Sequence, residues 1–133
     1  MKKDINFPKV QGVHIAILRE QVEKEQEWAV YIINENNHDI VDLMVTSKGY
    51  GEAEGKNIQT TALRRYIEKV EANSSLKFEI IPEELLGITN EFWLSYYINK
   101  TIYDKKYIFL PDSLIEENLI TVPIVNKKGV LIE

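Results

Sequence analysis

Residues 91–99, EFWLSYYIN, carry the clearest fold signal of the chain. Apolar side chains occupy every second position, which is the period of a β-strand with one face turned to a core. These positions are Phe92, Leu94, Tyr96 and Ile98. The positions between them include Trp93 and Tyr97, so the outward face of the same strand is also rich in aromatic side chains. Such a face needs a cover, either from the same chain or from a partner.

Similar short patterns recur along the rest of the sequence. They lie at residues 13–18, 27–34, 40–47, 76–80, 107–110, 119–125 and 130–132. We expect 27–34 and 40–47 to form a hairpin, because the residues between them are rich in Asn and Asp. The last two segments should form another, with Gly129 in the left-handed position that closes such turns.

Three further segments need separate treatment. Within residues 76–80 the alternation places Leu76, Phe78 and Ile80 on one face and leaves Glu79 on the other. Residues 60–71 fit either a helix or a strand, and strand is favoured. Residues 82–86 predict a helical turn, because proline suits a first helical position and a glycine follows at residue 87.

Composition agrees with a sheet protein. The chain has 28 Val and Ile residues against 5 Ala, and 133 residues are enough for one domain with its own core. We therefore predict a single all-β domain over residues 1–133, with at most one or two short helical turns. An immunoglobulin-like β-sandwich is the first choice, and a small β-barrel is the alternative.

Charge and residue usage exclude several classes of function. The net charge of −5 disfavours a general attraction to nucleic acid or anionic lipid. The absence of cysteine excludes disulfides, thiolate metal sites and cysteine nucleophiles. No secretory signal or membrane span is expected, so a cytoplasmic protein is predicted.

Catalysis is not indicated by any motif. No serine stands in a GxSxG context, and His14 and His38 are the only imidazoles. His38 lies near Asp39 and Asp42, but two histidines without ligand spacing do not predict a metal site. We expect a protein that is not an enzyme and that needs no cofactor or metal.

The glycine-rich stretch of residues 48–57 is predicted to be a loop, since three of the six glycines of the chain lie in it. Its glycines would let a partner approach the backbone closely, and Lys48 could meet an anion. With the aromatic faces this loop gives the candidate binding residues. They are Ser47, Lys48, Tyr50, Tyr31, Trp93 and Tyr97.

Binding to a second copy or to another protein is the leading functional hypothesis, because the outward aromatic side chains call for a cover. Contact with RNA is the alternative. It would use two basic pairs with tyrosines beside them on which bases can stack. These pairs are Arg64, Arg65, Lys105 and Lys106.

The chain also resembles a family of small uncharacterised bacterial proteins that often carry the label phenylalanyl-tRNA synthetase alpha subunit. The resemblance spans nearly the whole chain and is carried by residues 2–10, 27–31, 45–51 and 103–109. It implies an accessory link to tRNA or translation. The ATP-binding arginine motif and the glycine-rich motif of class II synthetases have no counterpart here, so the resemblance implies no catalytic residue and no aminoacylation.

Overall fold

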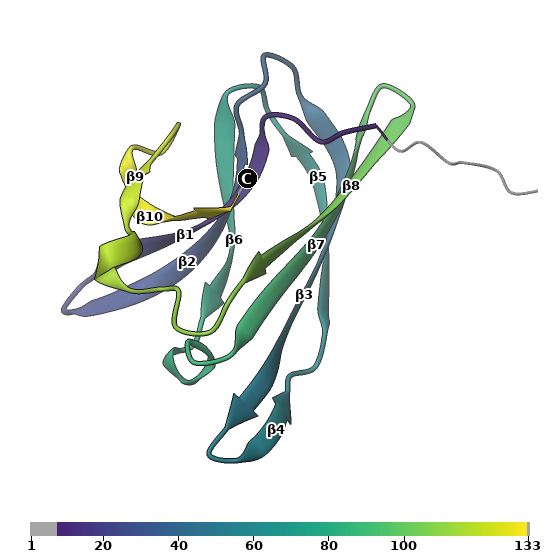
Figure 1. Ribbon diagram of the computed structural model, residues 1–133. Coiled ribbons are helices and arrows are strands. Elements are labelled where there is room, and N and C mark those ends of the chain that lie inside the picture. The colour runs from purple at the N-terminus through teal and green to yellow at the C-terminus, as the bar shows by residue number, and fades with distance from the viewer. Residues whose placement is uncertain (1–7, 133) are drawn as a thin grey trace, which may run out of the picture.

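The computed structural model describes residues 8–132 and consists of two antiparallel sheets packed face to face (Figure 1). The prediction of an all-β sandwich is confirmed, and the barrel alternative is wrong because the sheets do not close on each other. Residues 1–7, for which no secretory signal is predicted and which include part of the resemblance, lie outside the described residues, as does residue 133.

The first sheet, sheet A, has the strand order β6-β2-β1-β10-β9. Its strands are β1 (Val13–Val22), β2 (Glu25–Asn34), β6 (Ser74–Ile81), β9 (Ile120–Val122) and β10 (Lys127–Ile132). Strands β1 and β2 form a hairpin whose turn places Glu23 at a φ of 55°. The two strands are thus longer than the predicted segments 13–18 and 27–34, and the turn between them is made at Glu23 and Lys24.

The second sheet, sheet B, is built around a long strand that pairs on both sides. Its strands are β3 (Ile40–Ala53), β4 (Lys56–Gln59), β5 (Leu63–Val70), β7 (Thr89–Ile98) and β8 (Thr101–Phe109). Strand β3 pairs with β7 on one side and with β5 and then β4 on the other. The strand prediction for residues 60–71 is confirmed by β5.

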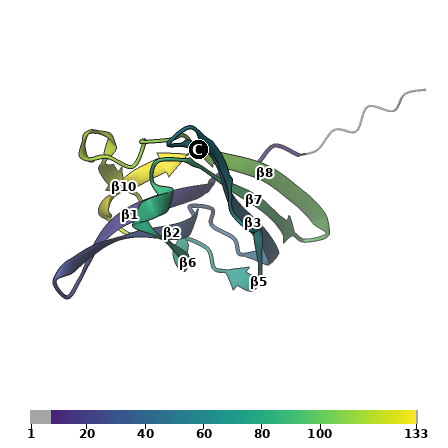
Figure 2. The same cartoon turned by 90° about the horizontal axis from the view of Figure 1, so that it is seen from below.

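Two 3-10 turns connect the strands. The turn η1 (Glu83–Leu85) confirms the helical turn predicted after Pro82, and η2 (Glu116–Asn118) lies before β9. The sheets approach each other on both sides of the sandwich: β5 lies beside the edge strand β6, and β8 lies beside β10, which is next to the edge of sheet A (Figure 2).

The core lies between the sheets and contains the alternate residues that the sequence turns inward. Ile15, Ile17 and Ile32 come from sheet A, and Phe92 and Leu94 come from sheet B. An edge-to-face aromatic chain crosses the interface, because the ring of Phe92 lies 6.0 Å from that of Phe78 on β6 and 5.8 Å from that of Phe109 on β8. The hydroxyl of Tyr107 also donates to the carbonyl of Val13 at 2.6 Å.

The predicted hairpin of residues 27–34 and 40–47 is wrong. Strand β2 belongs to sheet A and β3 to sheet B, so the Asn-rich turn crosses between the sheets. Buried Asn34 fixes this crossing, because its amide donates to the carbonyls of His38 at 3.0 Å and Glu71 at 3.0 Å. The Asn34 side chain thus donates hydrogen bonds to backbone carbonyls, a role that backbone amides would have in a hairpin.

The predicted alternation of residues 76–80 is wrong at its end. Between Val30 and Tyr31 the register with β6 shifts by one residue, which leaves Phe78 as the extra residue of a β-bulge. As a result Glu79 pairs with Val30, whose side chain is in the core, while Ile80 is exposed. The bulge therefore turns a carboxylate toward the interior.

The prediction of a left-handed Gly129 is also wrong. In the hairpin of β9 and β10 the left-handed residues are Ile124 and Asn126, with φ of 72° and 55°. Gly129 pairs instead with Leu18 of β1. A Cβ atom there would lie 2.5 Å from Leu18 Cδ2 and 2.8 Å from the carbonyl oxygen of Ile17, so close approach requires the glycine.

We predict that Gly129→Ala lowers the free energy of unfolding by about 1 to 3 kcal/mol, because the added methyl group overlaps packed side-chain and backbone atoms. Urea denaturation followed by circular dichroism measures this. The control is Gly87→Ala, where the nearest atom would be 3.9 Å away and little change is expected. Equal stabilities of wild type and Gly129→Ala would contradict the packing assigned to this strand.

Candidate functional site

The predicted glycine-rich loop is a strand. Strand β3 continues to Ala53, so Ser47, Lys48 and Tyr50 are strand residues. A Cβ atom on Gly49 would lie 2.9 Å from Ile88 Cδ1, which explains a glycine inside the strand. The turn itself is made at Gly55, whose φ is 75°.

Tyr31 lies on sheet A, away from the other aromatic candidates. The outer face of sheet A around it is covered by the chain itself, because Val122, Ile124 and Val125 pack over Leu18 and Ile33. The hydroxyl of Tyr31 donates to Glu20 at 2.5 Å. Burial and then the neighbouring carboxylate raise the pKa of Tyr31 to about 12. Tyr31 is thus part of a structural network.

The outer face of sheet B carries the other aromatic candidates. Trp93 is 47% exposed and Tyr97 is 37% exposed. Ile102 on β8 pairs with Tyr97, and Met44 on β3 pairs with Ser95, which lies between Trp93 and Tyr97 on the same face. Met44 and Ile102 are also exposed. We call Met44, Trp93, Tyr97 and Ile102 the outer patch. No described residue packs over this patch as Val122 to Val125 pack over sheet A.

Trp93 is held in position by its neighbours on β8. Its indole nitrogen donates to Asp104, and the ammonium of Lys106 lies 4.7 Å from the centre of its ring. Beside it a shallow hollow is lined by Met44, Thr46, Trp93, Ser95, Ile102 and Asp104. The outer patch therefore combines a fixed aromatic side chain with a depression.

The two basic pairs do not form one surface. Arg64 and Lys106 lie in the same cross-strand row as Trp93. Arg65 instead has its Nε 3.7 Å from Glu79 Oε1, and the ammonium of Lys105 lies 5.0 Å from the ring centre of Tyr107. Strand alternation separates neighbours in sequence, so only half of the predicted basic set shares a face with the aromatic side chains.

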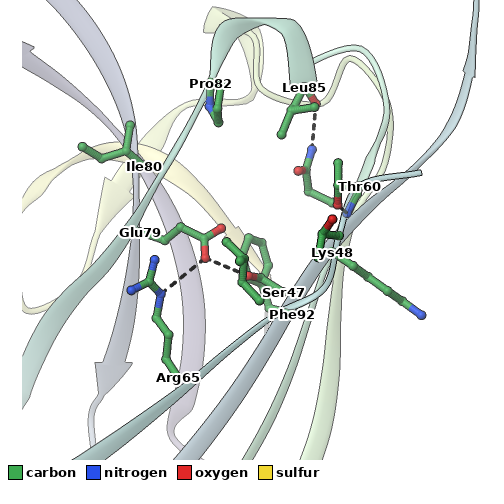
Figure 3. Close-up of a pocket in the computed structure, with 13 residues that line it drawn as sticks. Ser47, Lys48, Thr60, Arg65, Glu79, Ile80, Pro82, Leu85 and Phe92 are labelled. Atoms are coloured by element: carbon green, nitrogen blue, oxygen red, sulfur yellow. Dashed lines mark hydrogen bonds and ion pairs between the residues drawn. The ribbon is translucent and has the colours of Figure 1, made fainter. Parts of the chain in front are cut away.

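A second hollow lies at the edge where β5 and β6 meet, and we call it the edge pocket (Figure 3). Its volume is about 230 Å³. It is lined by Ser47, Lys48, Gly49, Thr60, Thr61, Leu63, Arg65, Glu79, Ile80, Pro82, Leu85, Asn90 and Phe92. Glu79 Oε1 accepts a hydrogen bond from Ser47 Oγ at 2.7 Å. The pocket thus has apolar side chains on part of its wall, polar ones on the rest, and an internal carboxylate.

Two of the predicted binding residues are directed away from the edge pocket. Lys48 lies on its rim, but its ammonium is 3.6 Å from Glu91 Oε2 and extends away from the cavity (Figure 3). Tyr50 also engages Glu91, because its hydroxyl donates to Oε1 at 3.1 Å. Burial first, and the Glu91 carboxylate second, raise the pKa of Tyr50.

Sequence reasoning missed several residues of both sites. Met44 and Ile102 could have been found, since each alternates with inward residues on its strand. Glu79 could not, because its inward direction depends on a bulge against β2. Asn90 is buried with its amide donating to the carbonyl of Leu85 at 2.9 Å, and no spacing motif marks it.

Within residues 8–132 no group of three or more acidic or histidine side chains is placed to hold a metal ion. The same part of the chain contains no helix that is long and apolar enough to cross a membrane. No family model, curated protein or solved structure matches the chain. The function must therefore be inferred from the two sites themselves.

The carboxylate that binds Tyr31 gives a pH prediction. Burial raises the pKa of Glu20, but hydrogen bonds from Tyr31, Lys77 and Lys127 outweigh it and hold the pKa below its ordinary value of 4.5. Its contribution to stability is therefore present above that value and is lost as the pH falls through the lowered pKa.

We expect Glu20→Gln to lower the free energy of unfolding by about 1 to 2 kcal/mol at pH 7, where three donors lose a charged acceptor. The difference from wild type should be smaller at pH 3 than at pH 7, because lowering the pH protonates a growing share of wild-type Glu20. Urea denaturation at both pH values measures it. A difference that is the same at pH 7 and pH 3 would show that the charge of Glu20 does not matter.

Proposed function

We propose that this chain is a non-enzymatic cytoplasmic binding protein that pairs with a second copy of itself through the outer patch of sheet B. The observation that carries the proposal is the exposure of Trp93, Tyr97, Met44 and Ile102 on one continuous sheet face. Contiguous exposed apolar side chains of this size mark interaction surfaces. Aromatic residues and Met are also the residue types enriched at the centre of interfaces.

The difference between the two sheets supports the proposal. The chain uses its own segment from Val122 to Val125 to cover the apolar outer face of sheet A. Its described residues provide no such cover for sheet B. Because the described residues of the chain cover the apolar outer face of sheet A but not that of sheet B, we infer that a partner covers sheet B.

The charges around the outer patch favour a second copy as that partner. Arg64 and Lys106 lie at the Trp93 row. Toward the other end, Asp42 accepts from the hydroxyl of Tyr66 at 2.5 Å. This hydrogen bond first, and the Glu68 carboxylate last, raise the pKa of Tyr66. A two-fold axis across the strands would place basic groups of one copy against acidic groups of the other, as an isologous interface requires.

We expect Trp93→Ala to weaken self-association at least tenfold, because a central aromatic side chain of an interface contributes most of the binding energy. Sedimentation equilibrium of the full chain measures the dimer dissociation constant. The free energy of unfolding should change by less than about 1 kcal/mol, since the side chain is half exposed in a single copy.

The matched control is Leu110→Ala, because Leu110 is 65% exposed and lies outside the outer patch. It should leave the dissociation constant unchanged. A wild-type chain that stays a monomer at every accessible concentration would contradict the proposal, and so would equal effects of the two substitutions.

A second candidate function is contact with tRNA, as the family resemblance implies. It is favoured by Lys106 lying over Trp93 with Arg64 in the same row, since bases stack on aromatic rings flanked by cations. Titration with tRNA at two salt concentrations separates the candidates. Binding that weakens steeply with salt and is lost in Trp93→Ala would support the RNA function, and no binding at low salt would remove it.

A further inference from the structure

We infer that the edge pocket binds a small primary amine, whose ammonium group is held by Glu79 and whose apolar body fills the cavity. This site is separate from the outer patch and goes beyond the self-association proposed above. The inference stands on three features: the state of the Glu79 carboxylate, the apolar walls, and the position of Arg65.

The Glu79 carboxylate is turned into the pocket and is only partly satisfied. Its side chain is 15% exposed, and Oε1 accepts the hydrogen bond from Ser47. Figure 3 shows the interactions with Ser47 and Arg65 meeting at this one oxygen. No described side chain or backbone amide donates to Oε2. This oxygen is open to the pocket rather than enclosed, so it is an accessible acceptor for a charged donor from a ligand.

The walls of the pocket define the rest of the ligand. Leu63, Ile80, Pro82, Leu85 and Phe92 supply apolar surface around the carboxylate. The volume of about 230 Å³ exceeds the roughly 150 Å³ that suffices for benzene in an apolar protein cavity. A ring or branched alkyl group with one short side chain therefore fits.

The charge distribution favours a cation over an anion. Arg65 has its Nε 3.7 Å from Glu79 Oε1, an ion pair about as long as that of Lys48 with Glu91. Because the arginine side chain is 45% exposed, it is a partner that an incoming ammonium group can displace. Lys48 on the rim is engaged by Glu91 on the other side of the strand. Each cation of the lining is thus paired with a carboxylate, and Glu79 Oε2 is left without a donor among the described residues. An ammonium group at Oε2 competes only with Arg65, whereas a carboxylate ligand meets a like charge there.

The test uses three probes of matched shape: benzylamine, benzyl alcohol and benzoate. Each is titrated into the isotope-labelled full chain while the backbone amide resonances of Ser47 and Thr60 are followed by NMR. We expect benzylamine to shift both resonances and to bind at least tenfold more tightly than benzyl alcohol, and benzoate to leave them in place. Equal responses to the three probes, a preference for benzoate, or no response to benzylamine at solubility-limited concentrations would overturn the inference.

Two substitutions test the assigned roles of the charges. Glu79→Gln should weaken benzylamine binding about tenfold or more, because it keeps the shape and removes the charge. Arg65→Met should strengthen it severalfold, because the competing cation is lost. An Arg65→Met chain that binds benzylamine more weakly would mean that the arginine contributes to ligand binding and would contradict the inference.

A further pair of variants keeps the test valid if Glu79→Gln does not fold. Leu63→Trp places a larger side chain at an exposed position on the pocket lining and should abolish binding of benzylamine. Leu110→Trp makes the same change at an exposed leucine elsewhere and should leave binding unchanged. Binding that survives in Leu63→Trp would place the ligand outside the edge pocket.

Discussion

The packing of Phe92 between Phe78 and Phe109 is the contact on which the arrangement of the sandwich depends. It joins an edge strand of sheet A to the centre and edge of sheet B. Since strand side chains alternate, fixing Phe92 inward also fixes Trp93 outward. On β6 the same contact lies at the bulge, so Phe78 and Glu79 both approach the interior. The outer patch and the edge pocket therefore both depend on how Phe78, Phe92 and Phe109 pack together.

Much of the fold could be predicted because it depends on local pattern. Alternation in residues 91–99 identified a strand, its buried face and its exposed aromatic face. Pairing partners could not be predicted, since alternation does not say which strand lies alongside, and buried Asn34 sends the chain to the other sheet. Gly49 was misread for a related reason, because it serves contact with distant Ile88. The inward turn of Glu79 likewise depends on the β2 partner.

The two outer faces show how the same apolar excess can be handled in two ways. On sheet A the segment before β10 folds over Leu18 and Ile33, and the polar network of Glu20 closes its margin. On sheet B the aromatic side chains remain accessible among the described residues. The covering segment of the chain thus lies on sheet A, and we propose that the accessible outer face of sheet B supports self-association. The edge pocket lies between the sheets and can be occupied whether or not the outer patch is.

Quenching of Trp93 fluorescence by acrylamide at rising protein concentration tests the central claim most directly, because it reports the patch itself. The measurement uses Trp28→Phe, which leaves Trp93 as the only tryptophan of the 133 residues. If the outer patch is the surface of self-association, quenching is strong in dilute solution and falls as the concentration passes the dimer dissociation constant. Quenching that stays equally strong over the range in which the chain forms dimers would contradict it.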